Sequence, residues 1–191
     1  WSPAVLKGAR VAMKVGWVFD RRFLQHDLGG VHVECPARLE VIVEALRGAA
    51  LLEHLAALRF SPATFEQLAL VHDPAYVELV QLMCDGGFTF IGSPDTYLCA
   101  ASYHVAALAA GGVLAACDAV MAGEVVRAFC AVRPPGHHAE ADQALGFCLF
   151  NHVAIAAEHL VRRHGVTRVA IVDFDAHHGN GTQHMFQRRR D

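Results

Sequence analysis

Side chains that bind metals gather in a short loop near residue 175 of this 191-residue sequence. The loop follows an apolar run from residue 168 that is rich in β-branched residues, which predicts a buried parallel strand. Residues i and i+2 of an extended backbone point to the same side, so Asp175 and His177 can meet one cation. Oxygen and nitrogen ligands suit zinc or a similar divalent metal. Asp173 lies deeper in the strand and is better placed to orient a histidine.

A second loop carries the adjacent histidines His137 and His138 behind a stiff Pro-Pro-Gly turn. It follows a strand predicted at residues 127–132 and precedes a helix predicted over residues 150–164. Residues 127–173 are therefore predicted to form one βαβ unit, which is parallel and right-handed almost without exception. Both loops should then meet at the carboxyl edge of the sheet, where open α/β sheets bind ligands.

These residue types together predict metal-assisted hydrolysis, with an amide as the substrate class that fits best. A divalent metal lowers the pKa of a bound water toward neutrality, and histidine titrates in the same range. A histidine can take a proton from water as the water attacks a carbonyl, and return it to a leaving amine. The side chains of Asp173 and Asn180 are candidates to hold the two histidines, one each.

Upstream of the two loops, the sequence predicts one strand at residues 15–19 and then mainly helices. N-cap residues and prolines at the first helical position indicate where the helices begin. The predicted helices begin at Pro36, Leu51, Ser61–Pro62, Asp73–Pro74 and Asp95. The helix that begins at Leu51 is predicted to end at Leu58, and the helix that begins at Asp95 is predicted to end near Gly123. The stretch 96–117 has no Asp, Glu, Lys or Arg, but its alanine content and missing basic flank indicate a buried core helix, not a membrane span.

The composition provides enough hydrophobic residues for a folded core, and the net charge does not favour binding to nucleic acid. Hydrophobic residues make up 54% of the sequence, and the formal net charge is -3. The six cysteines form no Cys-x-x-Cys pair and are expected to be free thiols in a reducing compartment, which favours the cytoplasm. No secretory signal stands out. Residues 1–12 are expected to be a non-native leader, and residues 13–191 to belong to one domain.

Four segments carry motifs of high specificity. They are Arg133-Pro134-Pro135-Gly136-His137-His138, Gly146-Phe147-Cys148-x-Phe150-Asn151, Asp173-x-Asp175-x-His177-His178-Gly179-Asn180-Gly181-Thr182, and Glu34-Cys35-Pro36-x-Arg38. Together they resemble the family of zinc-dependent histone deacetylases and acetylpolyamine amidohydrolases, except that Val33 stands where the family has proline, and Asn180 resembles the family's class II branch. The similarity runs from about Met13 to about Phe186. It implies an α/β fold of the arginase/deacetylase type, with a mostly parallel sheet and helices on both faces.

The resemblance also implies roles for the residues of the two loops. Asp175 and His177 would be zinc ligands. His138 would be the general base, with His137 as its partner. The main-chain carbonyl groups of Asp173, Asp175 and His177 would help to hold a structural potassium ion.

Five further residues receive supporting roles from the same resemblance. Asp173 would orient His137, and Asn180 would support His138. Gly146 and Phe147 would line the channel for the acylated lysine. Arg38 would line an internal cavity beneath the metal.

The sequence departs from the family in one large respect. The family's third zinc ligand, an aspartate, and its carbonyl-polarising tyrosine have no counterpart in these 191 residues. We therefore expect the N-terminal part of a catalytic domain, with a sheet that is incomplete at the C-terminus, weak zinc binding and little or no hydrolysis. Acetylated lysine and acetylpolyamines are both candidate substrates, neither nucleic acid nor a membrane is an expected partner, and the oligomeric state stays open.

Two alternatives remain at this point. Asp175-Ala176-His177 also resembles arginase-type ureohydrolases, which use a pair of manganese ions, although the sequence has few bridging carboxylates for such a pair. The other alternative is a non-catalytic binding module, because half a parallel sheet would leave an apolar strand edge exposed.

Overall fold

A three-stranded parallel sheet lies at the centre of the computed structural model, which describes residues 14–30 and 32–190. The strand order is β2-β1-β3, with β1 at Val15–Val18, β2 at Leu55–Ala57 and β3 at Arg127–Cys130. The strands expected near residues 15–19 and 127–132 are therefore present, each slightly shorter than predicted. The leader expected at residues 1–12 lies outside the described residues.

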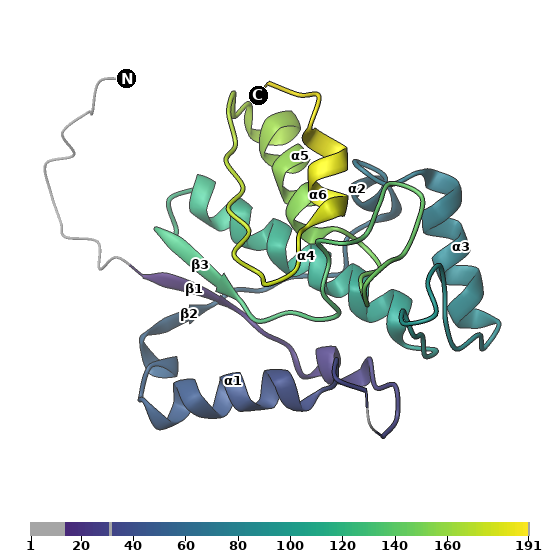
Figure 1. Ribbon diagram of the computed structural model, residues 1–191. Helices are drawn as coiled ribbons and strands as arrows, with labels where there is room; N and C mark the ends of the chain where they lie inside the picture. The colour runs from purple at the N-terminus through teal and green to yellow at the C-terminus, as the bar shows by residue number, and fades with distance from the viewer. Residues whose placement is uncertain (1–13, 31, 191) are drawn as a thin grey trace, which may run out of the picture.

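Helices cover both faces of this sheet, as expected for the arginase/deacetylase-like fold. Figure 1 shows α1 (Ala37–Gly48) on one side and α4 (Ser102–Met121) with α5 (His152–His164) on the other. The remaining helices are η1 (Arg21–Gln25), η2 (Leu52–His54), α2 (Phe65–Leu68), α3 (Pro74–Asp85) and α6 (Asn180–Phe186).

The alanine-rich helix α4 is a core element, in agreement with the sequence. It is long and apolar enough to cross a membrane by length and composition, but its small side chains are mostly buried against the sheet and α5. At Gly111 the helix backbone lies close to residues 61–63, because a Cβ atom there would collide with the backbone of Ser61 and Ala63. The small residues therefore serve packing between protein segments.

The predicted start of α4 at Asp95 is wrong. Asp95 accepts a hydrogen bond from the hydroxyl of Ser93 and caps no helix, and residues 96–101 form an irregular segment. The helix begins at Ser102, whose Oγ lies 2.8 Å from the backbone nitrogen of Cys99 and 2.8 Å from Nδ1 of His26. The contact with His26 joins residues 76 positions apart, so the local sequence does not reveal it.

Two other helix predictions also fail. Residues 51–58 form η2 and strand β2 instead of a helix, because Leu55 pairs with Val15 of β1 in the parallel sheet. The helix expected at Ser61–Pro62 begins later, at Phe65, because the backbone N–H of Ala63 donates to the carbonyl of Ala107 in α4 (2.8 Å).

Three other predicted helix boundaries are confirmed. Helix α1 follows Pro36, α3 begins with Asp73 as N-cap and Pro74 at its first position, and α5 ends at Gly165 in the left-handed conformation (φ 65°).

All six cysteines are free, and burial raises the pKa of the Cys148 thiol to about 12. Free thiols were expected, but only Cys84 and Cys148 are buried and the other four are partly exposed.

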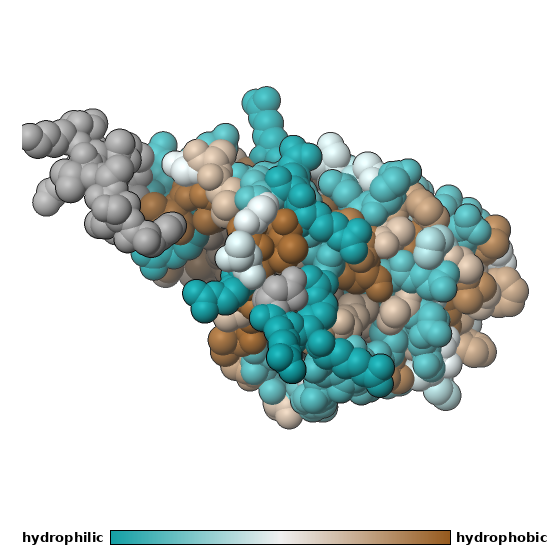
Figure 2. All heavy atoms as spheres, turned by 90° about the horizontal axis from the view of Figure 1, so that it is seen from above, coloured by the Kyte–Doolittle hydropathy of each residue, from teal (hydrophilic) through white to brown (hydrophobic). Residues whose placement is uncertain are grey.

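The buried strand predicted at residues 168–173 does not form, so the second half of the expected βαβ unit is wrong. No other strand in the described part of the chain pairs with this segment, and an isolated strand leaves its own N–H and C=O groups unpaired. Val172 and Phe174 are 83% and 96% exposed. Figure 2 shows apolar surface between hydrophilic side chains on the face that includes α5 and the C-terminal segment.

Candidate active site

One cavity of about 550 Å³ brings the two loops together, as the sequence predicted. Residues implied by the sequence that line it are Arg38, His137, His138, Gly146, Phe147, Asp175 and His177. The loops meet although the second strand is missing, because the start of α6 packs on the histidine loop. The backbone N–H of Thr182 donates to the carbonyl of His137 (3.2 Å), and a Cβ atom on Gly181 would collide with Ala139.

His137 is held by Asp173 behind the cavity. The Nδ1 atom of His137 lies 2.8 Å from Oδ2 of Asp173, and Oδ1 of Asp173 accepts from the backbone N–H of Asp175 (3.1 Å). The hydrogen bond from His137 lowers the pKa of the Asp173 carboxyl. Gly179 is required here, because a Cβ atom at that position would fall on the Asp173 carboxylate. Asp173 therefore has the position expected of an orienting group.

His138 is held by Asn180, and the surrounding contacts define its tautomer. Nδ2 of Asn180 donates to the carboxylate of Glu140 (2.6 Å), which can only accept, so Oδ1 of Asn180 faces His138 as an acceptor. Nδ1 of His138, 2.6 Å away, must then carry a proton. The Nε2 atom of His138 is left as the atom that can accept a proton from a reactant.

Asp175 and His177 lie at the cavity with their ligand atoms together. Oδ1 of Asp175 is 3.1 Å from Nδ1 of His177 and accepts from the backbone N–H of His177 (2.8 Å). That backbone hydrogen bond is the main reason why the pKa of Asp175 is lowered. Two ligand atoms of a tetrahedral zinc ion lie about 3.3 Å apart, so the donor types and their spacing fit zinc.

The expected metal centre has only these two ligands within reach. Among residues 14–30 and 32–190, no third His, Cys, Asp or Glu places a ligand atom within 4.8 Å of both Asp175 and His177. Both side-chain oxygens of Asp173 are hydrogen-bonded, one to His137 and one to the backbone N–H of Asp175.

Gly146 and Phe147, the residues expected to line a substrate channel, have an unusual backbone conformation next to His138. Gly146 and Phe147 both have positive φ, 54° and 67°, and the Phe147 backbone N–H donates to Oγ1 of Thr96 (3.1 Å). The Phe147 ring packs edge-on against His32, with centroids 4.8 Å apart. A Cβ atom on Gly146 would overlap the His138 ring, so a larger residue there would displace the imidazole.

Arg38 lies at the cavity but is not enclosed by it. It is in the first turn of α1, 61% of its side chain is exposed, and its Nη1 atom lies 3.9 Å from Oε1 of Glu34. Beneath it, Arg133 makes two hydrogen bonds to the Glu34 carboxylate (2.8 and 2.7 Å), and both side chains are buried. This ion pair anchors the histidine loop. The sequence analysis did not predict it, although the charged Arg133 at the end of an apolar strand was an available signal.

One further supporting residue, His72, was also missed. The backbone N–H of Asn151 donates to Nε2 of His72 (2.9 Å), so the His72 proton is on Nδ1, which donates to the carbonyl of Glu140 (2.9 Å). Burial lowers the pKa of His72 to about 4 and keeps the ring neutral. His72 precedes the Asp73 N-cap of α3, and its sequence context gave no sign of this contact with the histidine loop.

Comparison with known proteins gives a consistent result. The family model described as "Histone deacetylase domain" matches residues 32–191. Histone deacetylase 5 of Arabidopsis thaliana is 44% identical to 91% of the chain, and the Pseudomonas aeruginosa histone deacetylase-like amidohydrolase is 41% identical to 92% of it. Polyamine deacetylase HDAC10 of Rattus norvegicus is 42% identical to 81% of the chain.

Structural comparison agrees with the sequence comparison. The crystal structure of the HDA15 HD domain superposes with a TM-score of 0.88 at 35% identity, covering 93% of this chain and 51% of that one. The chain spans 28%, 44% and 27% of the lengths of the Arabidopsis, Pseudomonas and rat relatives, so it corresponds to a part of each.

Proposed function

The chain belongs to the histone deacetylase family, and from this premise we propose that it forms part of a zinc-dependent site that removes acetyl groups from lysine side chains or polyamines. The observation that carries the proposal is the pair of oriented histidines. His137 bonds to Asp173 and His138 bonds to Asn180, beside Asp175 and His177 in one cavity. The relatives named as histone and polyamine deacetylases support the hydrolytic class.

In the proposed site, Asp175 and His177 hold zinc together with a further ligand. Bound zinc supplies Lewis-acid polarisation of the acetyl carbonyl and of the attacking water. The short contact between Oδ1 of Asp175 and Nδ1 of His177 supports this assignment. The main-chain carbonyl of Asp173 is the proposed contribution to a potassium site, as the resemblance to the family implies.

His138 is the proposed general base. Its Nε2 atom takes a proton from water as the water attacks the acetyl carbon, and the proton then passes to the amine nitrogen as the C–N bond breaks. Acetate and a free amine are the products. Asn180 keeps the proton of His138 on Nδ1, and Glu140 keeps Asn180 in the required orientation. His137, held by Asp173, is the proposed partner of His138 and binds the attacking water.

The proposed substrate channel passes Phe147. Gly146 gives the substrate room beside His138, and the Phe147 ring offers an apolar wall for the methylene groups of lysine or of a polyamine. Both substrates present an acetyl amide on a flexible aliphatic amine, so both fit the wall. A cytoplasmic location is proposed from the free cysteines alone.

A chimera gives a direct test. Residues 14–190 would replace the matching segment of the Pseudomonas relative, and acetate release would be measured from an acetyl-lysine peptide and from an acetylated polyamine. We expect hydrolysis by the chimera and a loss of at least a hundredfold in His138→Ala, because general-base catalysis contributes about 10²–10⁴-fold. The matched control is His178→Gln, whose ring bonds to Gln183 and lies outside the cavity lining.

A folded chimera that binds zinc but releases no acetate would contradict the proposal. Release of urea from arginine with manganese would favour the ureohydrolase alternative. The 191-residue chain by itself is expected to bind zinc weakly and to hydrolyse little or nothing, because two ligands are fewer than the three that catalytic zinc sites have. Robust turnover by that chain would contradict this part of the proposal.

A second candidate function is binding to another protein segment. The extended segment that contains Val172 and Phe174 exposes apolar side chains and unpaired backbone groups, which favour association. Size-exclusion chromatography tests this candidate, since a clean monomer at high concentration argues against it.

A further inference from the structure

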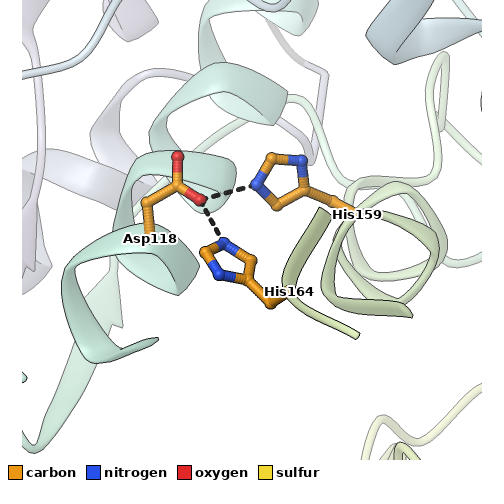
Figure 3. A group of neighbouring side chains, drawn as sticks. All are labelled: Asp118, His159 and His164. Carbon is orange, nitrogen blue, oxygen red and sulfur yellow. Dashed lines mark hydrogen bonds and ion pairs between the residues drawn. The ribbon is translucent and has the colours of Figure 1, made fainter. Parts of the chain in front are cut away.

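A second group of metal-ligating side chains lies between α4 and α5, apart from the cavity. Figure 3 shows Asp118 of α4 facing His159 and His164 of α5. Oδ1 of Asp118 lies 2.7 Å from Nε2 of His159 and 2.6 Å from Nε2 of His164. None of these residues lines the candidate active site, and the deacetylase proposal does not use them.

The three side chains converge on one point from two rigid elements. The imidazole planes are inclined by 67°, and each ring directs its Nε2 atom at the same carboxylate oxygen. All three ligand atoms lie within 4.8 Å of one another. Two imidazole nitrogens and a carboxylate oxygen are a ligand set suited to zinc and to similar divalent transition metals.

The helix ends add an independent electrostatic argument. Asp118 lies in the last turn of α4, which ends at Met121, and His164 is the last residue of α5. The C-terminal end of a helix carries a partial negative charge. Two such ends and a carboxylate therefore favour a cation between them. A carboxylate in the last turn of a helix is unfavourable unless a cation accompanies it.

Arg163 is the competing cation at this place. Its Nε atom lies 3.7 Å from Oδ1 of Asp118, but 66% of its side chain is exposed. It can therefore turn into solvent without leaving a buried charge unpaired. The Asp118 side chain is 40% exposed and that of His164 is 20% exposed, so the cluster has an open side from which an ion can enter.

We propose that Asp118, His159 and His164 bind a zinc-sized divalent transition metal, with water at the remaining position. Each imidazole binds through Nε2 and keeps its proton on Nδ1. Ligand atoms of tetrahedral zinc lie about 3.3 Å apart, so the present contacts must open by roughly half an ångström, which small side-chain rotations allow. The metal links the ends of α4 and α5.

Cobalt(II) is the probe for the test, because its visible absorption reports imidazole and carboxylate coordination. The chain would carry Asp175→Asn and His177→Gln, so that the other metal-ligating pair contributes nothing. We expect one equivalent of Co²⁺ to bind, to be displaced by Zn²⁺, and to raise the melting temperature. In the same background, His164→Gln should weaken binding at least tenfold, although glutamine still can donate to Asp118.

The matched control is His54→Gln, an exposed histidine of η2, which should leave the affinity unchanged. Asp118→Asn provides a second variant that keeps the size of the side chain, and circular dichroism checks that each variant is folded. Absence of binding in the Asp175→Asn/His177→Gln background overturns the proposal, as does an unchanged affinity in folded His164→Gln or Asp118→Asn. Because this background lacks the active-site pair, neither result depends on the deacetylase proposal.

Discussion

The stability of the protein should depend on pH through His72, and removing this side chain should flatten that dependence. His72 is buried, accepts from the Asn151 backbone on Nε2 and donates from Nδ1 to the Glu140 carbonyl. A second proton on Nε2 would break the first of these hydrogen bonds and place a charge in the core. Glutamine in place of His72 can offer one donor and one acceptor without titrating, so His72→Gln is the informative change.

The magnitude follows from the pKa of His72, which burial lowers from 6.5 to about 4. The unfolded chain then binds the proton more tightly than the folded chain, so stability is complete above the unfolded pKa and falls as the pH drops toward 4. The whole difference corresponds to about 3 kcal/mol, of which about 2 kcal/mol is lost at pH 5. His26, whose pKa burial also lowers to about 4, adds a similar loss that His72→Gln leaves in place.

Urea unfolding followed by far-ultraviolet circular dichroism at pH 7, 6 and 5 measures this effect. Between pH 7 and pH 5, the free energy of unfolding should fall by about 2 kcal/mol less in His72→Gln than in the parent chain. His54→Gln is the control, because that residue is exposed and its replacement should leave the difference unchanged. Equal pH dependence in the parent chain and in His72→Gln would refute the reasoning, since His72 would then be no source of it.

The remaining predictions concern packing and the buried ion pair. Gly111→Ala should lower the free energy of unfolding by more than about 3 kcal/mol, because the new Cβ atom would collide with the backbone of Ser61. At Gly48 a new Cβ atom would meet no other atom, so Gly48→Ala should stabilise α1 by about 0.5–1 kcal/mol. Similar stability of the two alanine variants in urea would contradict the packing argument. Glu34→Gln should cost about 3–5 kcal/mol, because it leaves the buried Arg133 without its carboxylate, and a loss below 1 kcal/mol would show that the pair contributes little.

Much of the site could be predicted from residue order alone. The Pro-Pro-Gly turn before His137 and the polar run after residue 172 are local patterns, and each places ligating side chains at the end of an apolar segment. The expected convergence of the loops is confirmed by the cavity that they share. The hydrogen bonds of His137 to Asp173 and of His138 to Asn180 are also present, and the resemblance had assigned them in this order.

The supporting contacts could not be predicted, because they join residues far apart in the chain. His72 bonds to Glu140, and Arg133 bonds to Glu34 across 99 positions. Each of these polar groups is satisfied only by a partner that folding brings to it, and nothing in its own neighbourhood identifies that partner. The hydrogen bond from the Asn180 amide to Glu140 could not be predicted either, because it depends on how the folded chain orients that amide.

Local sequence therefore identified the polar residues that meet at the cavity and indicated where α1, α3 and α5 begin or end. The sheet is parallel as expected, but the βαβ unit from which this was inferred does not form. Tertiary structure decided the rest. Residues 55–57 became a strand because β1 offered a partner, whereas the more strand-like residues 168–173 did not, because no strand in the described part of the chain lies beside them. Strand formation requires a neighbour for the backbone N–H and C=O groups, and the sequence of one segment does not reveal whether that neighbour is present.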